Sequence, residues 1–239
     1  MSGTLPFPTR SVFPRREGPL RVGFCVSGGG RLCRAAVEHA AALGIAPSAL
    51  ILDRRAADAL DAWGRDAGMA VHRLAAPRRP ELDGELIAAF DAAPADLWML
   101  TFDKILPQAV VLQRRGRIVN VHMALLPAFA GMHGIRQTLA GGARFGGATI
   151  HEVDEEMDHG PTVVQCALPL VPEDTEESAG LRLWPLLHAA YLQVLAWYAA
   201  GRVVRDDKGR LWVAGAQYGA WPVSPAVELP ERVACPAPA

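Results

Sequence analysis

Three polar side chains in the middle of the chain offer an amide, an imidazole and a carboxylate. Asn120 and His122 come just past a short apolar strand, and Asp158 follows later in a segment that ends in Gly160 and Pro161. An amide and an imidazole can stabilise an oxyanion by hydrogen bonds, and an imidazole beside a carboxylate can move protons. We therefore expect the chemistry of this protein at these three residues.

The elements that must position these residues follow an alternating β and α pattern in the first half of the chain. This alternation predicts an α/β fold with a mostly parallel, Rossmann-like doubly wound sheet. The expected strands cover residues 20–26, 49–52, 71–74, 97–101 and 118–121, and the expected helices cover 31–43, 56–67 and 81–92. Ligands of such sheets bind beyond the carboxyl ends of the strands. The loops at 27–30 and 102–106 and the residues 120–122 are therefore expected to converge on one cleft.

The second half of the chain predicts a few further elements and no second domain. Strands are expected at 148–153 and 162–170, and Asp174 and Thr175 give an N-cap signal for a long helix that ends near residue 200. A hairpin is expected at 203–205 and 211–213, followed by a mobile Pro-rich end. We expect residues 1–19 to be a flexible arm, 20–203 the main domain and 204–239 the hairpin and tail.

Composition excludes several classes of protein. The chain has 239 residues, of which 51% are hydrophobic and 21% charged, and its net charge of −1 gives no electrostatic reason to expect nucleic acid or an anionic membrane as a partner. It has no apolar run long enough to span a bilayer. Its four cysteines, Cys25, Cys33, Cys166 and Cys235, are far apart, so neither a zinc site nor a disulfide framework is expected. A cytoplasmic location is the simplest expectation.

The three glycines Gly28, Gly29 and Gly30 end the first strand of the expected sheet. Such a cluster suits either a tight turn into a helix or an anion at the helix N-terminus. A dinucleotide fingerprint would need a further glycine at position 33, where this chain has Cys33, so NAD is not expected.

The order of motifs around the polar trio resembles that of the folate-dependent formyltransferase family. The resemblance spans roughly residues 20–203 and is closest to the enzymes that formylate glycinamide ribonucleotide. It starts with an Asn-x-His that follows a strand and precedes a Leu-Leu-Pro turn, at residues 120–127. The other matching segments are 131–137, 147–151, 157–161 and Gln165.

The resemblance implies a catalytic role for Asn120, His122 and Asp158 in transfer from 10-formyltetrahydrofolate, with no metal. Asn120 and a protonated His122 would donate hydrogen bonds to the oxyanion, and Asp158 would support His122 and relay a proton. His151 lies within a strand and either supports His122 or acts directly, and these two alternatives stay open. His133, in a loop, is a weaker candidate.

The resemblance also implies which segments hold the folate. In the family, two segments bind the pteridine ring, largely through backbone groups and apolar side chains. Here they correspond to Phe102, Asp103, Lys104, Ile105 and Leu106 and to Val153, Asp154, Glu155, Glu156 and Met157. Plain core packing is the alternative for Ile105 and Leu106.

Departures from the family pattern concern the acceptor side, which is expected at Gly28, Gly29, Gly30, Arg31 and Leu187. The enzymes that act on glycinamide ribonucleotide usually have Asn between the loop glycines and Ser-Asn after them, where this chain has Gly29 and Arg31-Leu32. They also have an acidic residue one position before a histidine on the long helix, where this chain has Leu187 before His188. An aliphatic side chain cannot hydrogen-bond an amine. We therefore expect a different small amine as acceptor.

Two other functions fit parts of the pattern. Residues 126–129 also resemble the formyltetrahydrofolate deformylases, in which water replaces the amine, although that family usually carries an N-terminal regulatory domain. A noncatalytic folate- or nucleotide-binding module would not need all three reactive side chains. A tRNA formyltransferase is disfavoured, because the segment after Gly201 is too short for the RNA-binding domain of that family. The apolar residues of the expected hairpin could pack on the protein's own sheet or form a homodimer interface.

Overall fold

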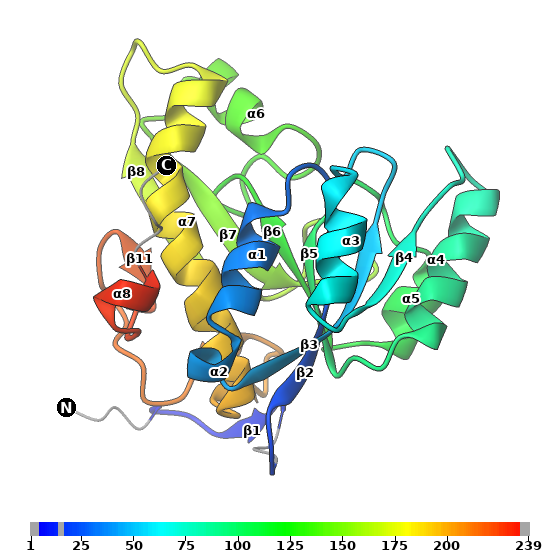
Figure 1. The fold of residues 1–239 in the computed structure, drawn as a ribbon. Coiled ribbons are helices and arrows are strands. Elements are labelled where there is room, and N and C mark those ends of the chain that lie inside the picture. Colours follow the sequence, from blue (N-terminus) through cyan, green and yellow to red (C-terminus); the bar gives the residue numbers. More distant parts are fainter. Residues whose placement is uncertain (1–4, 14–16, 235–239) are drawn as a thin grey trace.

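An eight-stranded sheet forms the centre of the computed structural model, which describes residues 5–13 and 17–234 (Figure 1). The strand order is β11-β8-β7-β6-β5-β2-β3-β4. The strands are β2 (Leu20–Val26), β3 (Ile45–Leu52), β4 (Ala70–Arg73), β5 (Leu97–Thr101), β6 (Ile118–His122), β7 (Phe145–Glu152), β8 (Thr162–Pro169) and β11 (Val223–Ser224). The five strands from β4 to β6 pair in parallel, whereas β7, β8 and β11 pair antiparallel. The expected α/β fold with a mostly parallel central sheet is confirmed.

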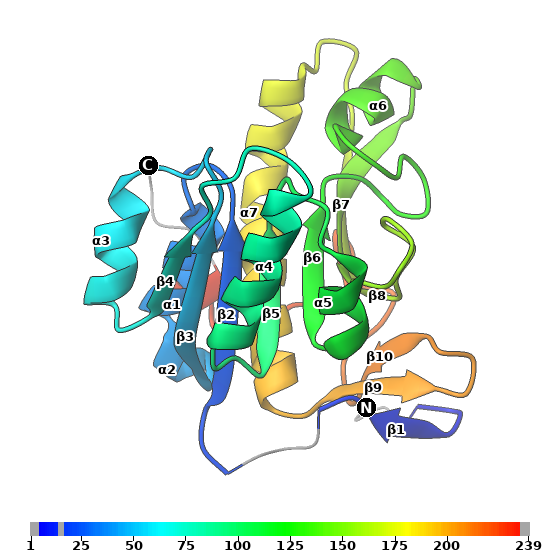
Figure 2. The ribbon, with the colours of Figure 1, turned by 90° about the vertical axis from the view of Figure 1, so that its right-hand side faces the viewer.

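Helices cover both faces of this sheet, as its apolar strands require. On one face lie α1 (Arg31–Glu38), α2 (Ala40–Leu43), α3 (Ala59–Asp66) and α7 (Glu176–Ala199), and they share the larger hydrophobic core with the sheet. On the other face, α4 (Glu81–Ala92) and α5 (Gln108–Gln113) form a smaller core, and Figure 2 shows these two helices in front of the sheet. Two short helices, α6 (Gly134–Ala140) and α8 (Glu231–Ala234), lie outside these layers.

The long helix α7 begins where the N-cap signal predicted. The Thr175 side chain accepts a hydrogen bond from the Ser178 backbone N–H, and the Ser178 side chain accepts one from the Thr175 N–H, so both members of a capping box are present. The apolar face of the helix buries Leu183, Leu187 and Leu195 in the larger core, and each fully buried leucine contributes about 1.5–3 kcal/mol. Neither α7 nor any other described helix is long and apolar enough to cross a membrane.

A second, three-stranded sheet joins an N-terminal strand to the hairpin that follows α7. The hairpin of β9 (Val203–Asp206) and β10 (Leu211–Val213) is present, and β1 (Thr9–Ser11) pairs antiparallel with β9. The expectation that residues 1–19 form a flexible arm is therefore wrong for residues 9–13: β1 completes the free edge of β9, and Phe13 is buried against Tyr198 with ring centroids 5.7 Å apart. The domain boundaries at residues 20 and 203 stay predictions.

Several element ends differ from the sequence prediction. The helix expected over residues 31–43 is interrupted at His39, which leaves α1 and α2 as separate helices. The Pro-rich end expected to be mobile is held by the large sheet as far as residue 234, because Val223 pairs with Cys166 and Val233 is buried; residues 235–239 lie outside the described part. The apolar hairpin residues Val203, Leu211 and Val213 pack in the protein's own core.

Candidate active site

Strand β6 carries Asn120 and His122 on one face of the large sheet, since residues two apart in a strand point the same way. The sequence predicted Asn120 and His122 just past the strand, whereas both belong to β6, because the antiparallel strand β7 pairs Asn120 with His151 and His122 with Thr149. Their place at the carboxyl end of the strand agrees with the prediction, since His122 is the last residue of β6. The pairing therefore brings Asn120 and His151 together directly.

His122 and Asp158 form the central contact of the site. His122 Nδ1 lies 3.2 Å from Asp158 Oδ2, and its Nε2 lies 2.9 Å from the backbone oxygen of Phe129. His122 is buried, and only 11% of the Asp158 side chain is exposed. Because both ring nitrogens face oxygen acceptors, only the doubly protonated imidazolium can donate both hydrogen bonds.

Asp158 is fixed by its own backbone and by two glycines. Its φ of 58° lies in the left-handed region, and its Oδ2 accepts a hydrogen bond of 2.8 Å from the Gly131 N–H. At Gly160, a Cβ would lie 1.9 Å from the backbone oxygen of Glu152, so no other residue fits without moving the loop. The glycine of the Met-Asp-x-Gly-Pro motif thus lets the loop approach β7 closely enough for Asp158 to reach both histidines.

His151 contacts both Asn120 and Asp158. Its Nδ1 donates a hydrogen bond of 2.8 Å to the Glu152 carbonyl, its Nε2 lies 3.4 Å from Asn120 Nδ2, and the same Nε2 lies 3.6 Å from Asp158 Oδ1. Burial lowers the pKa of His151 below its ordinary value, and the Glu152 carbonyl and Asp158 only partly offset this effect. The neutral ring with its proton on Nδ1 can accept the Asn120 amide at Nε2. The sequence left open whether His151 supports the other residues or acts directly, and this geometry favours support.

The Leu-Leu-Pro turn is held by a buried threonine that sequence analysis did not single out. Thr149 Oγ1 accepts from the Leu126 N–H at 3.0 Å and donates to the Ala124 carbonyl at 2.8 Å, and Gln165 Nε2 donates to both Leu126 O and Thr149 Oγ1. This turn leads to Phe129, whose carbonyl faces His122. Thr149 and Gln165 lie in segments that match the family, but only the fold reveals their contacts.

His133, the weaker candidate, is exposed and precedes α6.

The loop after β5 is tied to the loop after β2. The Asp103 N–H donates to Ser27 Oγ at 3.0 Å, Ser27 Oγ donates to the buried Asp53 at 2.8 Å, and Lys104 Nζ lies 3.4 Å from Asp53 Oδ2. Asp103 itself pairs with Arg55 at 2.7 Å. Residues 27 and 103 therefore meet as expected, whereas one cleft shared with residues 120–122 stays a prediction. The charges of Asp103 and Lys104 are already paired with protein groups.

The two segments expected to hold folate contain both core-packed and exposed apolar side chains. Phe102, Leu106 and Val153 all pack with the smaller core, whereas Ile105 is 58% exposed and Met157 49% exposed. The charged residues of the second segment have partners within the protein. Arg115 pairs with Glu155, Glu156 pairs with His159, and Asp154 Oδ1 accepts from the Glu156 N–H.

The segments expected on the acceptor side combine an open glycine turn, an arginine stacked on an aromatic ring and a buried leucine. Gly28 and Gly30 have positive φ angles, and a Cβ at Gly28 or Gly29 would meet no atom within 4 Å. Arg31 lies over the Trp184 ring, 3.8 Å from its centroid. Leu187, expected to contact the acceptor, is only 3% exposed and packs in the larger core.

Among the described residues, no group of three or more His, Cys, Asp or Glu side chains is arranged to hold a metal ion. Cys25, Cys33 and Cys166 are buried free thiols, and burial raises the pKa of Cys166 to about 11. They are therefore poor nucleophiles.

Comparisons with known proteins agree on the family. Residues 26–195 match the family model described as formyl transferase. The phosphoribosylglycinamide formyltransferase of Escherichia coli is 36% identical over 163 residues, which cover 65% of this chain and 76% of that protein. Its counterpart from Mycobacterium tuberculosis is 35% identical over 172 residues, which cover 70% and 79%.

Solved structures agree with the sequence relatives. The crystal structure of phosphoribosylglycinamide formyltransferase from Anaplasma phagocytophilum superposes with a TM-score of 0.72 at 29% identity and covers 82% of this chain and 94% of that one. A formyltetrahydrofolate deformylase from Pseudomonas syringae shares the fold, with a TM-score of 0.70 at 20% identity, over 82% of this chain and 66% of that one. The chain therefore belongs to the formyl transferase family and is a formyl-folate-dependent transferase.

Proposed function

We propose that this enzyme moves the formyl group of 10-formyltetrahydrofolate to a small amine other than glycinamide ribonucleotide. The observation that carries the acceptor assignment is the burial of an aliphatic residue, Leu187, at the helix position where the resemblance implies a carboxylate. The observation that supports the chemistry is the contact of His122 with Asp158 beside Asn120.

Asn120 and His122 act on the formyl oxygen. Attack of the amine on the formyl carbon turns this oxygen into an oxyanion, and each well-aimed donor contributes roughly 3 kcal/mol to the transition state. One N–H of Asn120 is directed at His151, so its second N–H is free for the oxyanion. The Nε2–H of His122, which faces Phe129 O, must turn partly toward the oxyanion as charge develops.

Asp158 handles charge and protons. Its carboxylate lies within 4 Å of a ring nitrogen of both His122 and His151, so it can accept a hydrogen bond from His122. The attacking amine loses a proton and the folate nitrogen gains one. Asp158, directly or through a water, relays that proton.

The donor lies between the segments 102–106 and 153–157 in this proposal. The apolar side chains of Phe102, Leu106 and Val153 form the wall under the ring, and the exposed Ile105 and Met157 lie where they can cover it. Backbone groups supply the polar contacts, because the carboxylates and Lys104 already have partners.

The acceptor is a small amine of another kind, such as an amino acid, hydroxylamine, hydrazine or amino sugar. Arg31 is held over Trp184 next to the Gly28–Gly30 turn and can still pair with an anionic group of the acceptor. Leu187 supplies no hydrogen bond for an amine.

Glycinamide ribonucleotide is the second candidate acceptor, favoured because the relatives in E. coli and M. tuberculosis are named for that substrate. Hydrolysis of the donor is the third outcome, since water can take the place of an amine in the same site.

The test is incubation of the purified protein with 10-formyltetrahydrofolate alone, with glycinamide ribonucleotide, and with a pool of other small amines. Tetrahydrofolate release and product mass are followed, and the Asp158→Asn variant serves as the inactive control. Release that needs one of the other amines, with a product heavier by one formyl group, supports the proposal. Equal or faster formylation of glycinamide ribonucleotide overturns the acceptor assignment, and amine-independent release of formate identifies a hydrolase.

A further inference from the structure

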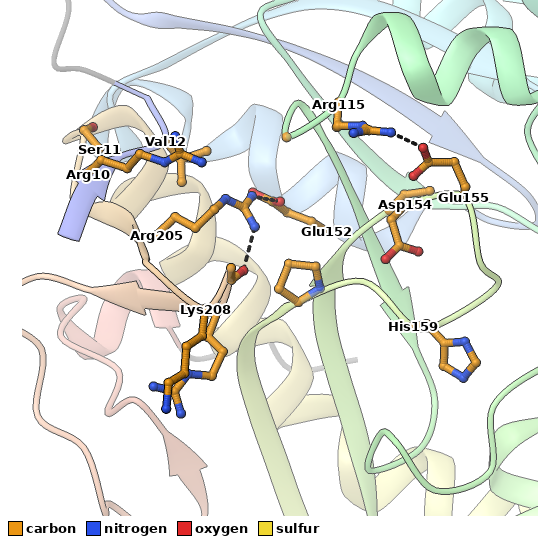
Figure 3. A pocket seen from close by; sticks show the side chains of 15 residues that line it. Arg10, Ser11, Val12, Arg115, Glu152, Asp154, Glu155, His159, Arg205 and Lys208 are labelled. Carbon is orange, nitrogen blue, oxygen red and sulfur yellow. Dashed lines mark hydrogen bonds and ion pairs between the residues drawn. The ribbon is translucent and has the colours of Figure 1, made fainter. Parts of the chain in front are cut away.

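A pocket of about 830 Å³ lies where the three-stranded sheet meets the end of the large sheet. Its walls come from β1, from the β9–β10 hairpin, from the start of β6 and from the loop after β7 (Figure 3). None of the catalytic trio lines it, and neither does any residue of the segments 27–31 and 102–106. The pocket is therefore separate from the site described above, although it shares Val153, Asp154 and Glu155 with the loop proposed to hold folate.

The lining of this pocket is strongly charged and has a surplus of positive charge. Its cationic side chains are Arg10, Arg115, Arg205, Lys208 and Arg210, and its carboxylates are Glu152, Asp154 and Glu155. The lining side chains have a surplus of two positive charges, and of one once Asp206, the partner of Arg210, is counted, in a chain whose net charge is −1. The pocket therefore differs in charge from the protein as a whole, and an anion is the ligand that this difference favours.

Most of the charges in the lining are already neutralised by a partner. Arg205 pairs with the buried Glu152 and also donates to the Gly209 carbonyl at 2.8 Å, and Arg115 pairs with Glu155 (Figure 3). Arg210 pairs with Asp206, 2.8 Å away. These pairs fix the walls of the pocket rather than offering free charge.

Two cations, Arg10 and Lys208, have no carboxylate partner within the described ranges 5–13 and 17–234. They come from opposite ends of the chain, β1 and the β9–β10 turn, and the pairing of β1 with β9 brings both to one pocket. The register of β1 against β9 explains why both lie at the same pocket. Arg10 stands opposite Arg205, and Lys208 lies in the turn that follows β9.

We propose that this pocket binds a small anion that carries phosphate or carboxylate groups, held by Arg10 and Lys208. The Arg10 guanidinium and the Lys208 ammonium donate charge-assisted hydrogen bonds to its oxygens. The paired Arg205 and Arg115 form part of the walls of the same pocket. The ligand then rests on the outer side of the loop that starts at Val153, so the site is a second small-molecule site beside the catalytic domain's active site.

The experiment is titration calorimetry of the full chain at low ionic strength, with inorganic pyrophosphate and, separately, citrate as probes. The double variant Arg10→Gln/Lys208→Gln removes the two unpaired charges. The control Arg78→Gln/Arg144→Gln removes two charges from exposed positions that do not line the pocket. All four side chains are exposed, so folding is retained, and circular dichroism checks this. Binding is read directly and does not depend on formyl transfer.

We expect the wild type and the control to bind at least one probe, and the pocket variant to bind it about tenfold more weakly or worse. The probe that binds identifies whether phosphate or carboxylate is preferred. The reversed-charge variant Lys208→Glu should lose binding as well. Absence of binding to both probes by the wild type, or equal weakening in the pocket and control variants, overturns the proposal.

Discussion

Asn120 Nδ2 lies 3.4 Å from His151 Nε2, across the antiparallel pairing of β6 with β7. Since His151 donates through Nδ1 to the Glu152 carbonyl, its Nε2 is left as an acceptor, and it can fix the orientation of the Asn120 amide. The histidine thus determines where the second amide N–H points. In the proposed mechanism Asn120 donates to the oxyanion, and His151 orients its amide.

The His151→Phe variant tests this positioning role. We expect kcat to fall about tenfold, because the amide is no longer oriented, whereas Asn120→Ala removes the donor itself and costs about 100-fold or more. In a double-mutant cycle, His151→Phe should have little further effect when Asn120 is already alanine, since the two side chains act as one unit. Independent, multiplicative losses in kcat would show that His151 acts through some other group.

Asp158→Asn should cut turnover by about 100-fold or more and leave folding and folate binding intact. The asparagine carbonyl can still accept the hydrogen bond from the Gly131 N–H, so the loop stays in place. Turnover, the melting temperature and the Kd of the folate donor are measured together. Near-normal turnover in this variant removes Asp158 from the mechanism.

Much of the fold follows directly from local sequence patterns. Strand β5 and helix α4 have the predicted bounds, because β5 is an unbroken apolar run and α4 has a regular spacing of apolar residues. The motif order also identified the residues that the fold brings together, since Asp158 lies near His122 and His151. Local patterns are strongest where burial is uniform along an element.

Contacts between distant segments could not be predicted in the same way. The strand β1 has three exposed residues and no apolar pattern, and it exists because β9 offers a free edge. The Phe129 carbonyl and the Thr149 hydroxyl act through positions set by the turn at Leu126, which no single-residue pattern reveals. The burial of Leu187 depends likewise on how α7 rotates against the sheet.

Gly160→Ala should lower both stability and activity. A Cβ at this position would lie 1.9 Å from Glu152 O, a backbone atom that cannot move aside without displacing β7. The loop would shift, and Asp158 with it. The matched control is Gly84→Ala in helix α4, where a Cβ meets no atom within 4 Å and the helix should gain up to about 1 kcal/mol. Thermal melts and turnover of the two variants are compared, and a Gly160→Ala enzyme with unchanged kcat would contradict the argument.

Stability should fall on the acid side through His151. Burial lowers the pKa of His151 from its ordinary 6.5, so the neutral ring is favoured in the folded state. The contribution of His151 to the free energy of unfolding is therefore fully present above pH 6.5. It is lost as the pH falls from 6.5 toward the pKa of His151 in the folded state, at up to about 1.4 kcal/mol per pH unit. The free energy of unfolding of the wild type and of His151→Phe is measured from pH 7.5 to 5. The advantage of the variant relative to the wild type should grow as the pH falls, and parallel curves would show that His151 does not titrate on unfolding.

Leu187→Glu tests both the burial of this position and its link to the acceptor. The side chain is 3% exposed in the larger core, so an unpaired carboxylate there should cost about 3 kcal/mol or more of the free energy of unfolding. Formylation of the native amine should drop. The control Leu187→Met keeps the volume and should cost under about 1.5 kcal/mol. If Leu187→Glu instead melts like the wild type, position 187 opens toward the acceptor. The set of amines that this variant formylates is then compared with that of the wild type. An unchanged set would show that Leu187 does not govern acceptor choice.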